Sequence, residues 1–528
     1  MISVLWRENS ILTRSQILNT LDATADQEDV ILKRLKAIGV LKPIRSNNTV
    51  VTERDSEFYS TIDTTSKMIV GFVGVAVVLG RVIKCFPKYV SDADDAVRHL
   101  RQALRVLEKL NASASSLKNA VPDLNGTLSD SLRTYLFLLR DYFEFGSYTR
   151  THEFLEHNGM GEINWDWTIN SSYPIISDSR PYYVDLITRK VLDDDSNYFK
   201  QLHESILTQV SSELTYAGIS ELFDLPRVQL SDQPISSFGD NEEILYKVEN
   251  ELNEQFDTRK RAVLTAIYSF LSNHQAIESD ESDLFYGTGD FAHVWEVACK
   301  KVYGDQLNSQ LDAMTLPSPL RENYSGKTLL NIIEKPYWSY VDHDAAKTLE
   351  PDVIVSRQTQ GKWRFVILDA KYYTPRFDEN NTPKGVPGVE SVTKQYLYQL
   401  AYKEFLKQHR FTGFSNCFII PSDTCEVQDF GTVAMKMLNR VGLADIDIRM
   451  VPAFRVFDSF LLGETLNIDT LQLTTTPVQV DLALSGNDLQ SHIVLNSASQ
   501  KTMRERLGMW LVNRRENSAP SATGDSAV

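Results

Sequence analysis

Two carboxylates and a lysine occur in an arrangement that could support metal-assisted hydrolysis of phosphodiesters. Asp352 opens a short apolar strand, and Asp369 and Lys371 stand near the end of the next one, Lys362 to Tyr373. Because side chains alternate along a strand, Asp369 and Lys371 lie on one face. If the two strands pair as a hairpin, Asp352 approaches Asp369. Carboxylates suit Mg²⁺, which stabilises phosphate charge and activates water, and a lysine can position that water.

Asp-x-Lys by itself is a weak signal, because a surface ion pair at a strand end has the same spacing. The surrounding elements strengthen the chemical interpretation. A helix with an apolar stripe is predicted over residues 290–302 and carries Glu296 near that stripe. A second helix is predicted over residues 391–408, with Gln395 and Gln399 four residues apart. The predicted order is helix, three strands, helix and strand.

This order and its motifs resemble the PD-(D/E)xK nuclease superfamily. They are more closely similar to the LlaJI-type restriction endonucleases, which are themselves similar to the McrC nuclease subunit of modification-dependent restriction systems. The resemblance covers roughly residues 72–421. The motifs that carry it are Val73-Gly74-Val75 through Cys85-Phe86-Pro87-Lys88, Gly161-Glu162-Ile163-Asn164-Trp165 with Thr168-Ile169, Val294-Trp295-Glu296, Pro351-Asp352, Asp369-Ala370-Lys371-Tyr372-Tyr373 and Tyr398-Gln399-Leu400-Ala401-Tyr402.

The resemblance implies an α/β multidomain protein with a C-terminal PD-(D/E)xK nuclease fold, an αβββαβ core whose mixed sheet is flanked by helices. Asp352, Asp369 and Glu296 would bind Mg²⁺, with Mn²⁺ as a substitute. Lys371 would lie beside the attacking water. The alternative for Glu296 is a carboxylate on the helix surface.

The resemblance also implies a glutamine that orients the lysine or the phosphate. We assign this role to Gln399, because Tyr-Gln-Leu-Ala-Tyr matches the McrC-type pattern. The chain departs from the superfamily's usual Gln-x-x-x-Tyr, so Gln395 stays open as the alternative. Either glutamine could instead belong to the polar face of a half-buried helix.

At 528 residues the chain is too long for one core, and roughly three or four domains are expected. The N-terminal parts are expected to be winged-helix-like and α+β, and the resemblance implies that they dock on a partner. The expected divisions are a winged-helix-like module at 1–55, a strand-rich and helical docking domain at 56–150, a mostly helical linking domain at 151–280, the nuclease domain with a C-terminal extension at 281–515, and a disordered tail at 516–528.

The first module carries recognisable local signals. Thr13 and Gln16 predict a capping box, and Gly39 predicts the end of a helix over residues 26–38. Residues 45–48 predict a wing turn between two strands. Such modules bind either DNA or protein, and the sequence leaves both possibilities open.

Composition bounds the partners and the compartment. The net charge of −16 is unfavourable for gripping DNA alone, so we expect a local basic groove or help from a partner. A basic helix at residues 499–512 is a candidate phosphate contact. The four cysteines lack metal-ligand spacing, so neither zinc nor a disulfide is expected. No segment is apolar for long enough to span a membrane, and the cytoplasm is the expected location.

Residues 325–328 contain the Gly-Lys-Thr of a phosphate-binding loop. The glycine that such a loop requires five residues before Gly326 is replaced by Arg321. We therefore expect no nucleotide to bind this chain. If the McrC likeness holds, a separate AAA+ GTPase or ATPase hydrolyses nucleotide.

The leading hypothesis is a Mg²⁺-dependent endonuclease subunit of a restriction system. It would cleave double-stranded DNA under control of the AAA+ partner. One alternative is a non-enzymatic adaptor that regulates an AAA+ motor and keeps a vestigial site. Another is a repair nuclease without a restriction partner. The DNA sequence or methylation state recognised does not follow from the residues.

Overall fold

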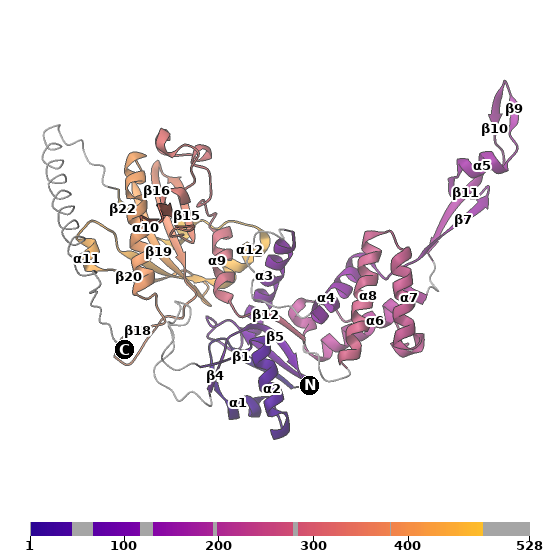
Figure 1. Cartoon of the computed structure of the whole chain (residues 1–528), viewed down its shortest axis with the longest axis horizontal. Helices are drawn as coiled ribbons and strands as arrows, with labels where there is room; N and C mark the ends of the chain where they lie inside the picture. The colour runs from indigo at the N-terminus through magenta and orange to yellow at the C-terminus, as the bar shows by residue number, and fades with distance from the viewer. Residues whose placement is uncertain are drawn as a thin grey trace, which may run out of the picture.

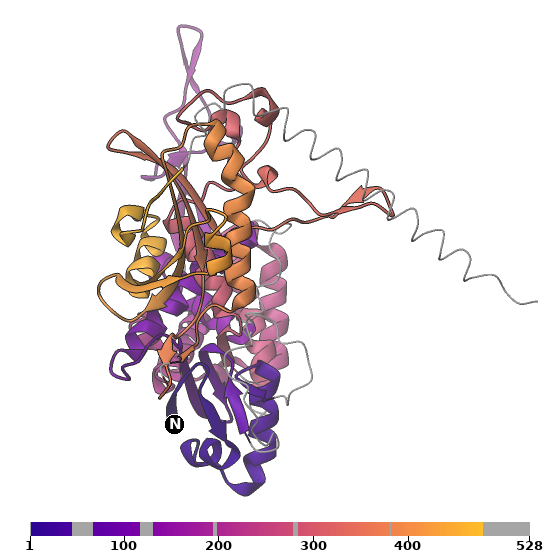
Figure 2. The same cartoon turned by 90° about the vertical axis from the view of Figure 1, so that its left-hand side faces the viewer.

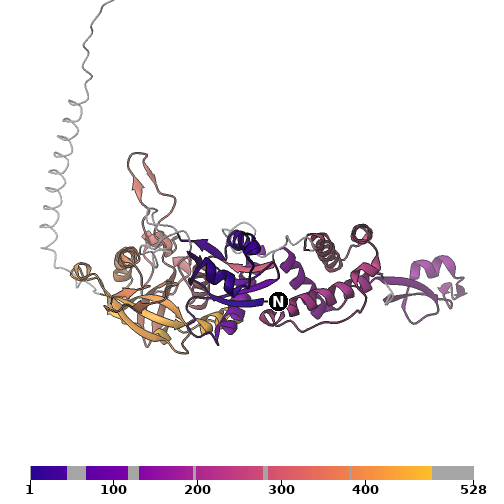
Figure 3. The same cartoon turned by 90° about the horizontal axis from the view of Figure 1, so that it is seen from below.

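The molecule is elongated, with three parts in a row (Figure 1). The computed structural model describes residues 2–44, 67–116, 130–193, 198–277, 284–380 and 382–478. A small N-terminal part lies between a helical part with a thin arm and a larger C-terminal sheet (Figure 3). The predicted wing turn, the basic helix at 499–512 and the tail at 516–528 lie outside the described residues.

The N-terminal module has two helices against a small antiparallel sheet in the order β2-β4-β3. Its elements are β2 (Ile11–Thr13), α1 (Arg14–Thr20), α2 (Ala25–Ile38), β3 (Leu41–Pro43) and β4 (Lys67–Val70). The predicted capping box is present, because the Thr13 hydroxyl accepts from Gln16 N–H and the Gln16 side chain accepts from Thr13 N–H. Gly39 ends α2 with φ of 88°, as predicted.

A four-stranded sheet joins this module to the rest of the chain in the order β1-β6-β5-β12. Its strands are β1 (Ile2–Arg7), β5 (Val73–Val78), β6 (Arg81–Phe86) and β12 (Leu284–Thr288). Gly74 pairs with Gly287, and a Cβ on Gly74 would stand 2.2 Å from the Tyr286 carbonyl oxygen, so only glycine fits this crossing. Since β12 follows residue 281, the N-terminal sheet takes a strand from beyond our expected domain boundary.

The helical part packs beside this sheet. It contains α4 (Asp130–Phe145), α6 (Tyr198–Tyr216), α7 (Asn241–Glu254) and α8 (Thr258–Ile277), whereas α3 (Ala96–Ser116) lies between the N-terminal sheet and the C-terminal part (Figure 1). One apolar cluster runs from Val75 of the sheet through Val210 of α6 and Trp295 to Leu368 of the C-terminal sheet. The three parts therefore share a continuous core. Within the described ranges, no helix is both long and apolar enough to cross a membrane.

A narrow arm extends from the helical part, away from both sheets (Figure 1). It consists of β7 (Thr151–His157), β8 (Glu162–Ile163), α5 (Trp165–Ser171), β9 (Ile175–Ser177), β10 (Arg180–Tyr182) and β11 (Ile187–Asp193). β11 pairs antiparallel with β7 and β8, while β9 and β10 form a terminal hairpin.

The C-terminal part is built on a mixed sheet in the order β15-β16-β19-β21-β20, with β22 paired to β19. β15 and β16 form an antiparallel hairpin, whereas β16, β19 and β21 run parallel. The elements are α9 (Phe291–Val302), β15 (Val353–Thr359), β16 (Lys362–Ala370), α10 (Val389–Gln408), β19 (Gly413–Ser422), β20 (Gln428–Val433), α11 (Lys436–Asn439), β21 (Ile446–Pro452), α12 (Ala453–Leu462) and β22 (Thr476–Pro477).

The expected αβββαβ order is wrong in one strand. Of the described residues between α9 and α10, only those of β15 and β16 join the main sheet. The chain between α9 and β15 is broken by Pro317, Pro319 and Pro336 and forms short turns of 3₁₀ helix. It also forms a separate hairpin of β13 (Tyr337–Trp338) and β14 (His343–Asp344), which projects from the body (Figure 2). Another two-stranded pair, β17 (Arg376–Phe377) and β18 (Pro383–Lys384), follows β16.

Candidate active site

The β15–β16 hairpin brings the predicted carboxylates together. Val353 pairs with Leu368, so Asp352 lies beside Asp369 at the end of the hairpin. An Asp352 carboxylate oxygen accepts the backbone N–H of Ala370 at 2.8 Å. The Lys371 ammonium lies 2.9 Å from an oxygen of Asp369, which is only 5% exposed. The structure thus unites Asp352, Asp369 and Lys371, as the hairpin argument predicted.

Apolar packing on both faces fixes this hairpin. Ile354, Phe365 and Ile367 pack against Tyr398 and Tyr402 of α10. Asp369 follows Ile367 by two residues and therefore faces the α10 side of the sheet. The opposite face of the sheet packs against α9 and α12. The residues in that packing include Val353, Leu368 and Ala370 from the sheet, Trp295 from α9 and Phe457 from α12.

The charges at the end of the hairpin are strongly coupled. Burial raises the pKa of Asp352 well above its ordinary value, and the neighbouring carboxylates of Asp369 and Glu296 raise it further. Lys371 and the Ala370 N–H oppose this shift in pKa but do not cancel it. The carboxylates of Asp352, Asp369 and Glu296 therefore repel one another, and a cation bound beside Asp352 and Asp369 would reduce that repulsion.

Glu296 acts electrostatically on Asp352 from α9, which packs on the other face of the sheet. Its side chain is about one quarter exposed and lies 3.6 Å from the Nδ1 atom of His293, one turn earlier. Among the described residues, no group of three or more His, Cys, Asp or Glu side chains has the geometry of a metal site. The structure therefore brings the carboxylates of Asp352 and Asp369 together. Glu296 affects them electrostatically.

The two candidate glutamines of α10 have different environments. The Gln399 amide is paired with the backbone of Ala444, donating to its carbonyl and accepting its N–H, each at 3.0 Å. Gln399 could orient Lys371 or a phosphate only if this pair were broken. Gln395 is fully buried, and its side-chain oxygen and nitrogen have no hydrogen-bond partner among the described residues.

Gln395 also lies above the sheet face that carries Asp369. The backbone carbonyl of Gln395 accepts a hydrogen bond from the Asn416 side chain at 3.2 Å. Asn416 pairs with Ile367 in the β16–β19 register. A buried amide with unused hydrogen-bonding capacity calls for an unseen partner such as water or substrate. The sequence could not separate Gln395 from Gln399, because the Ala444 backbone that engages Gln399 lies 45 residues away along the chain.

The Gly-Lys-Thr segment is bound by an acidic side chain. The Asp312 carboxylate accepts the Gly326 N–H at 2.6 Å and the Ser325 hydroxyl at 2.8 Å. The backbone N–H group that would face a phosphate is therefore held by an acidic side chain of the same protein.

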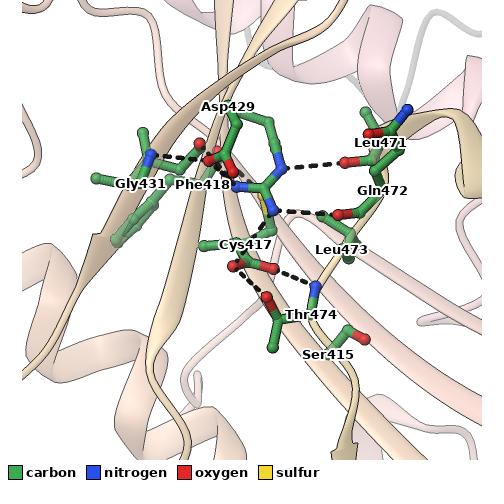
Figure 4. Close-up of polar contacts among 12 residues, drawn as sticks. Ser415, Cys417, Phe418, Asp429, Gly431, Leu471, Gln472, Leu473 and Thr474 are labelled. Carbon is green, nitrogen blue, oxygen red and sulfur yellow. Dashed lines mark hydrogen bonds and ion pairs between the residues drawn. The ribbon is translucent and has the colours of Figure 1, made fainter.

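A second charged cluster in the C-terminal part is structural. The Arg449 side chain is 5% exposed and ion-pairs with Asp447 and Asp429. Its guanidinium also donates to the carbonyls of Leu471 and Gln472, and Asp447 accepts from Thr474 (Figure 4). Because these contacts fill the hydrogen-bonding capacity of Arg449, the cluster fastens the last described segment to the sheet.

Comparison with known proteins agrees with the sequence motifs. Residues 72–457 match the model of the LlaJI restriction endonuclease family, and the chain belongs to that family. It is 26% identical over 421 residues to component YdjA of the type II restriction enzyme BsuMI of Bacillus subtilis strain 168. That match covers 78% of this chain and 84% of the relative. The protein is therefore a restriction-system component of a nuclease family.

Two solved structures show weaker similarity. One is a half-complex from a tetradecameric assembly of Thermococcus gammatolerans McrB AAA+ hexamers with bound McrC. Its matching chain is 12% identical with a TM-score of 0.33, covering 87% of this chain and 99% of that chain. The other is the McrBC complex of the same organism, 12% identical with a TM-score of 0.22, covering 56% of this chain and 84% of that chain. The family assignment rests on the sequence matches.

Proposed function

We propose that this protein is the endonuclease subunit of a restriction system, cleaving double-stranded DNA with Mg²⁺ at a PD-(D/E)xK site. The observation that carries the proposal is the meeting of Asp352, Asp369 and Lys371 at the end of the β15–β16 hairpin. Membership of a restriction endonuclease family supports the same reaction class. A structural ion pair would have no need for a second carboxylate that raises the pKa of the first.

The residues present fit a Mg²⁺ ion. Asp352 and Asp369 supply hard carboxylate oxygens, and Mg²⁺ is commonly held by one or two carboxylates while keeping several waters. Burial and the neighbouring carboxylates raise the pKa of Asp352, and Lys371 offsets this only in part, which favours a bound cation. Asp352 and Asp369 would hold the ion, with Glu296 acting on it through charge or a water. Bound Mg²⁺ would neutralise the phosphate and lower the pKa of a water.

Lys371 and Gln395 would have the remaining roles at the site. Lys371, which forms an ion pair with Asp369, would hydrogen-bond the attacking water or a phosphate oxygen. Gln395 has unused donor and acceptor capacity on the same face of the sheet, so we assign it the orienting role in preference to Gln399. The packed α10 and sheet keep these groups in fixed positions.

We further propose that an AAA+ GTPase or ATPase docks on the N-terminal and helical parts and licenses cleavage. An acidic chain with net charge −16 needs help to hold DNA. The arm exposes large apolar side chains, which are typical of a protein-binding surface. Those more than half exposed are Met160, Trp165, Trp167, Ile169, Tyr173, Ile175, Ile176, Tyr182 and Val184.

Plasmid cleavage tests the proposal directly. Wild type and Lys371→Ala would be incubated with Mg²⁺, each with and without a candidate AAA+ partner plus GTP or ATP. We expect cleavage by wild type with partner and nucleotide, and a loss of at least about 100-fold in Lys371→Ala. Lys362→Ala is the matched control, because Lys362 is an exposed lysine at the opposite end of β16.

The outcomes separate the proposal from its alternatives. No cleavage under any condition, with partner nucleotide turnover still stimulated by both wild type and Lys371→Ala, would identify an adaptor. Cleavage by wild type without any partner would contradict the proposal that an AAA+ protein controls cleavage. Equal cleavage by Lys371→Ala and wild type would place the active site elsewhere.

A further inference from the structure

The residue after Lys371 is bound by the N-terminal end of the chain. The Tyr372 hydroxyl donates a hydrogen bond to the Glu8 carboxylate, although 364 positions separate the two residues. The same Glu8 oxygen accepts the backbone N–H of Lys88 at 3.1 Å, and that N–H also lies 3.3 Å from the Tyr372 hydroxyl oxygen. Three segments from distant parts of the sequence thus meet at one carboxylate.

Glu8 and Lys88 are held firmly by the N-terminal sheet. Glu8 follows β1, and its N–H bonds to the Phe86 carbonyl at 2.9 Å, extending the β1–β6 ladder. The guanidinium of Arg7 donates from Nε to the Lys88 carbonyl at 2.9 Å. The Lys88 ammonium lies 4.7 Å from the centre of the Tyr372 ring.

The Tyr372 ring is enclosed on the other sides as well. It packs edge-on against Tyr89 of the N-terminal part and in a tilted arrangement against Phe291 of α9. Tyr372 is 7% exposed, and burial raises the pKa of Glu8, so this carboxylate depends on its few polar partners. A shift of β1 relative to β16 would take the Tyr372 hydroxyl away from this buried acid and leave it the Lys88 N–H.

Lys371 lies between two anchors. Its backbone N–H donates to the Ile419 carbonyl of β19 at 2.9 Å, while the next residue is bound by Glu8. These two hydrogen bonds fix the backbone at Lys371, and the backbone in turn sets the direction of the Lys371 side chain. Small displacements of reacting groups, about 1 Å, can reduce a rate about 100-fold.

We propose that Glu8 and Tyr372 are positioning residues that link the N-terminal sheet to Lys371, so that the placement of the N-terminal part sets the geometry of the cleavage site. This inference rests on the function proposed above and adds a route for its control. A partner docked on the N-terminal module would act on cleavage by strengthening or loosening the Glu8–Tyr372 contact.

The test compares Tyr372→Phe, Glu8→Ala, Glu8→Gln and the double variant Glu8→Ala/Tyr372→Phe. Single-turnover DNA cleavage is measured with Mg²⁺, the AAA+ partner and nucleotide, and DNA affinity is measured in EDTA. We expect Tyr372→Phe and Glu8→Ala to cleave roughly 10- to 100-fold more slowly with unchanged DNA affinity. Glu8→Gln keeps an oxygen that can accept the hydroxyl and should retain most of the rate. The double variant should be no slower than the slower single variant.

Tyr402→Phe is the matched control. It also removes a buried tyrosine hydroxyl, which donates to the Leu329 carbonyl, and its described core neighbours all belong to the C-terminal part. We expect its cleavage rate to equal that of wild type. If Tyr402→Phe slows cleavage as much as Tyr372→Phe does, the effect is general loosening of the domain and the proposal fails.

Hydrogen exchange of a peptide spanning residues 366–373 gives a readout that does not need cleavage. Exchange should be faster in Tyr372→Phe and Glu8→Ala than in wild type, and unchanged in Tyr402→Phe. Unchanged exchange in both link variants would overturn the link, even if wild type cleaves DNA well. Faster exchange in a protein that never cleaves DNA would keep the link and reject the proposed function instead.

Discussion

The Lys371 ammonium and the Asp369 carboxylate lie 2.9 Å apart at the end of β16, and the Asp352 carboxylate enters the same volume from β15. The three charged groups therefore interact electrostatically with one another. The consequences can be measured separately for cleavage, for metal binding and for stability.

Replacing Asp369 by Asn should abolish cleavage and leave the fold intact. The change removes one carboxylate from the proposed metal site while keeping the size of the side chain. We expect at least about a 100-fold loss in plasmid cleavage. Circular dichroism and partner binding should match wild type. Loss of assembly together with activity would show that Asp369 has a structural role instead.

In Asp352→Asn, the stability of the folded state should no longer depend on Mg²⁺. In wild type, Mg²⁺ at about 100 times its Kd should stabilise the folded state by about 2.7 kcal/mol. The variant loses a ligand, so its Tm should no longer respond to Mg²⁺. Without metal its Tm should exceed that of wild type, because the change removes the cost of burying a charge and the repulsion from neighbouring carboxylates. Asp312→Asn, at the exposed Gly326 loop, should keep the wild-type response to Mg²⁺.

Arg449→Met should destabilise the C-terminal sheet by about 3–5 kcal/mol, because Asp447 would be left buried without its counter-charge. Urea unfolding measures this loss. Arg357→Met is the control: Arg357 pairs with Asp469 at 3.1 Å with both side chains about 30% exposed, so its loss should cost less than about 1 kcal/mol. Equal losses would refute the structural role assigned to the Arg449 cluster.

The helical part should lose stability in mild acid through His203. Its Nδ1 accepts the Tyr148 N–H, and burial lowers the pKa of His203 to about 3. Unfolding restores the ordinary pKa of about 6.5, so the unfolded chain binds the proton first. The stabilising contribution is therefore complete above pH 6.5 and declines as pH falls from there toward 3.

At pH 5 this loss should be about 2 kcal/mol for the wild type. His203→Asn keeps an acceptor for Tyr148 but does not titrate, so its Tm should fall less between pH 7.5 and pH 5. His343→Asn, at an exposed hairpin position, should behave like wild type. A wild-type acid sensitivity that survives in His203→Asn would assign the effect to another group.

The arm tryptophans should matter for partner binding and hardly at all for stability. Trp165 and Trp167 are 53% and 56% exposed, so Trp165→Ser/Trp167→Ser should leave Tm nearly unchanged. Affinity for the AAA+ partner should fall by at least about tenfold, since exposed aromatic residues commonly dominate binding. Titration of labelled partner measures this, and unchanged affinity would place docking elsewhere on the chain.

Local patterns predicted much of the candidate site. Alternation along β16 placed Asp369 and Lys371 on one face, and two apolar segments joined by a turn predicted the hairpin that brings in Asp352. Thr13 with Gln16 and Gly39 marked helix ends correctly, because capping depends on neighbours within a few residues. The family assignment also followed from short motifs, and residues 72–457 match the family model.

Only the tertiary structure decided which distant groups meet. The Gln399 amide is taken by Ala444, β12 joins the N-terminal sheet, and Glu8 binds the residue after Lys371. None of these pairings leaves a periodic trace in the sequence, because each depends on how whole sheets and helices pack. The sequence by itself determined the kind of chemistry at the hairpin, whereas long-range packing decided which side chains support it.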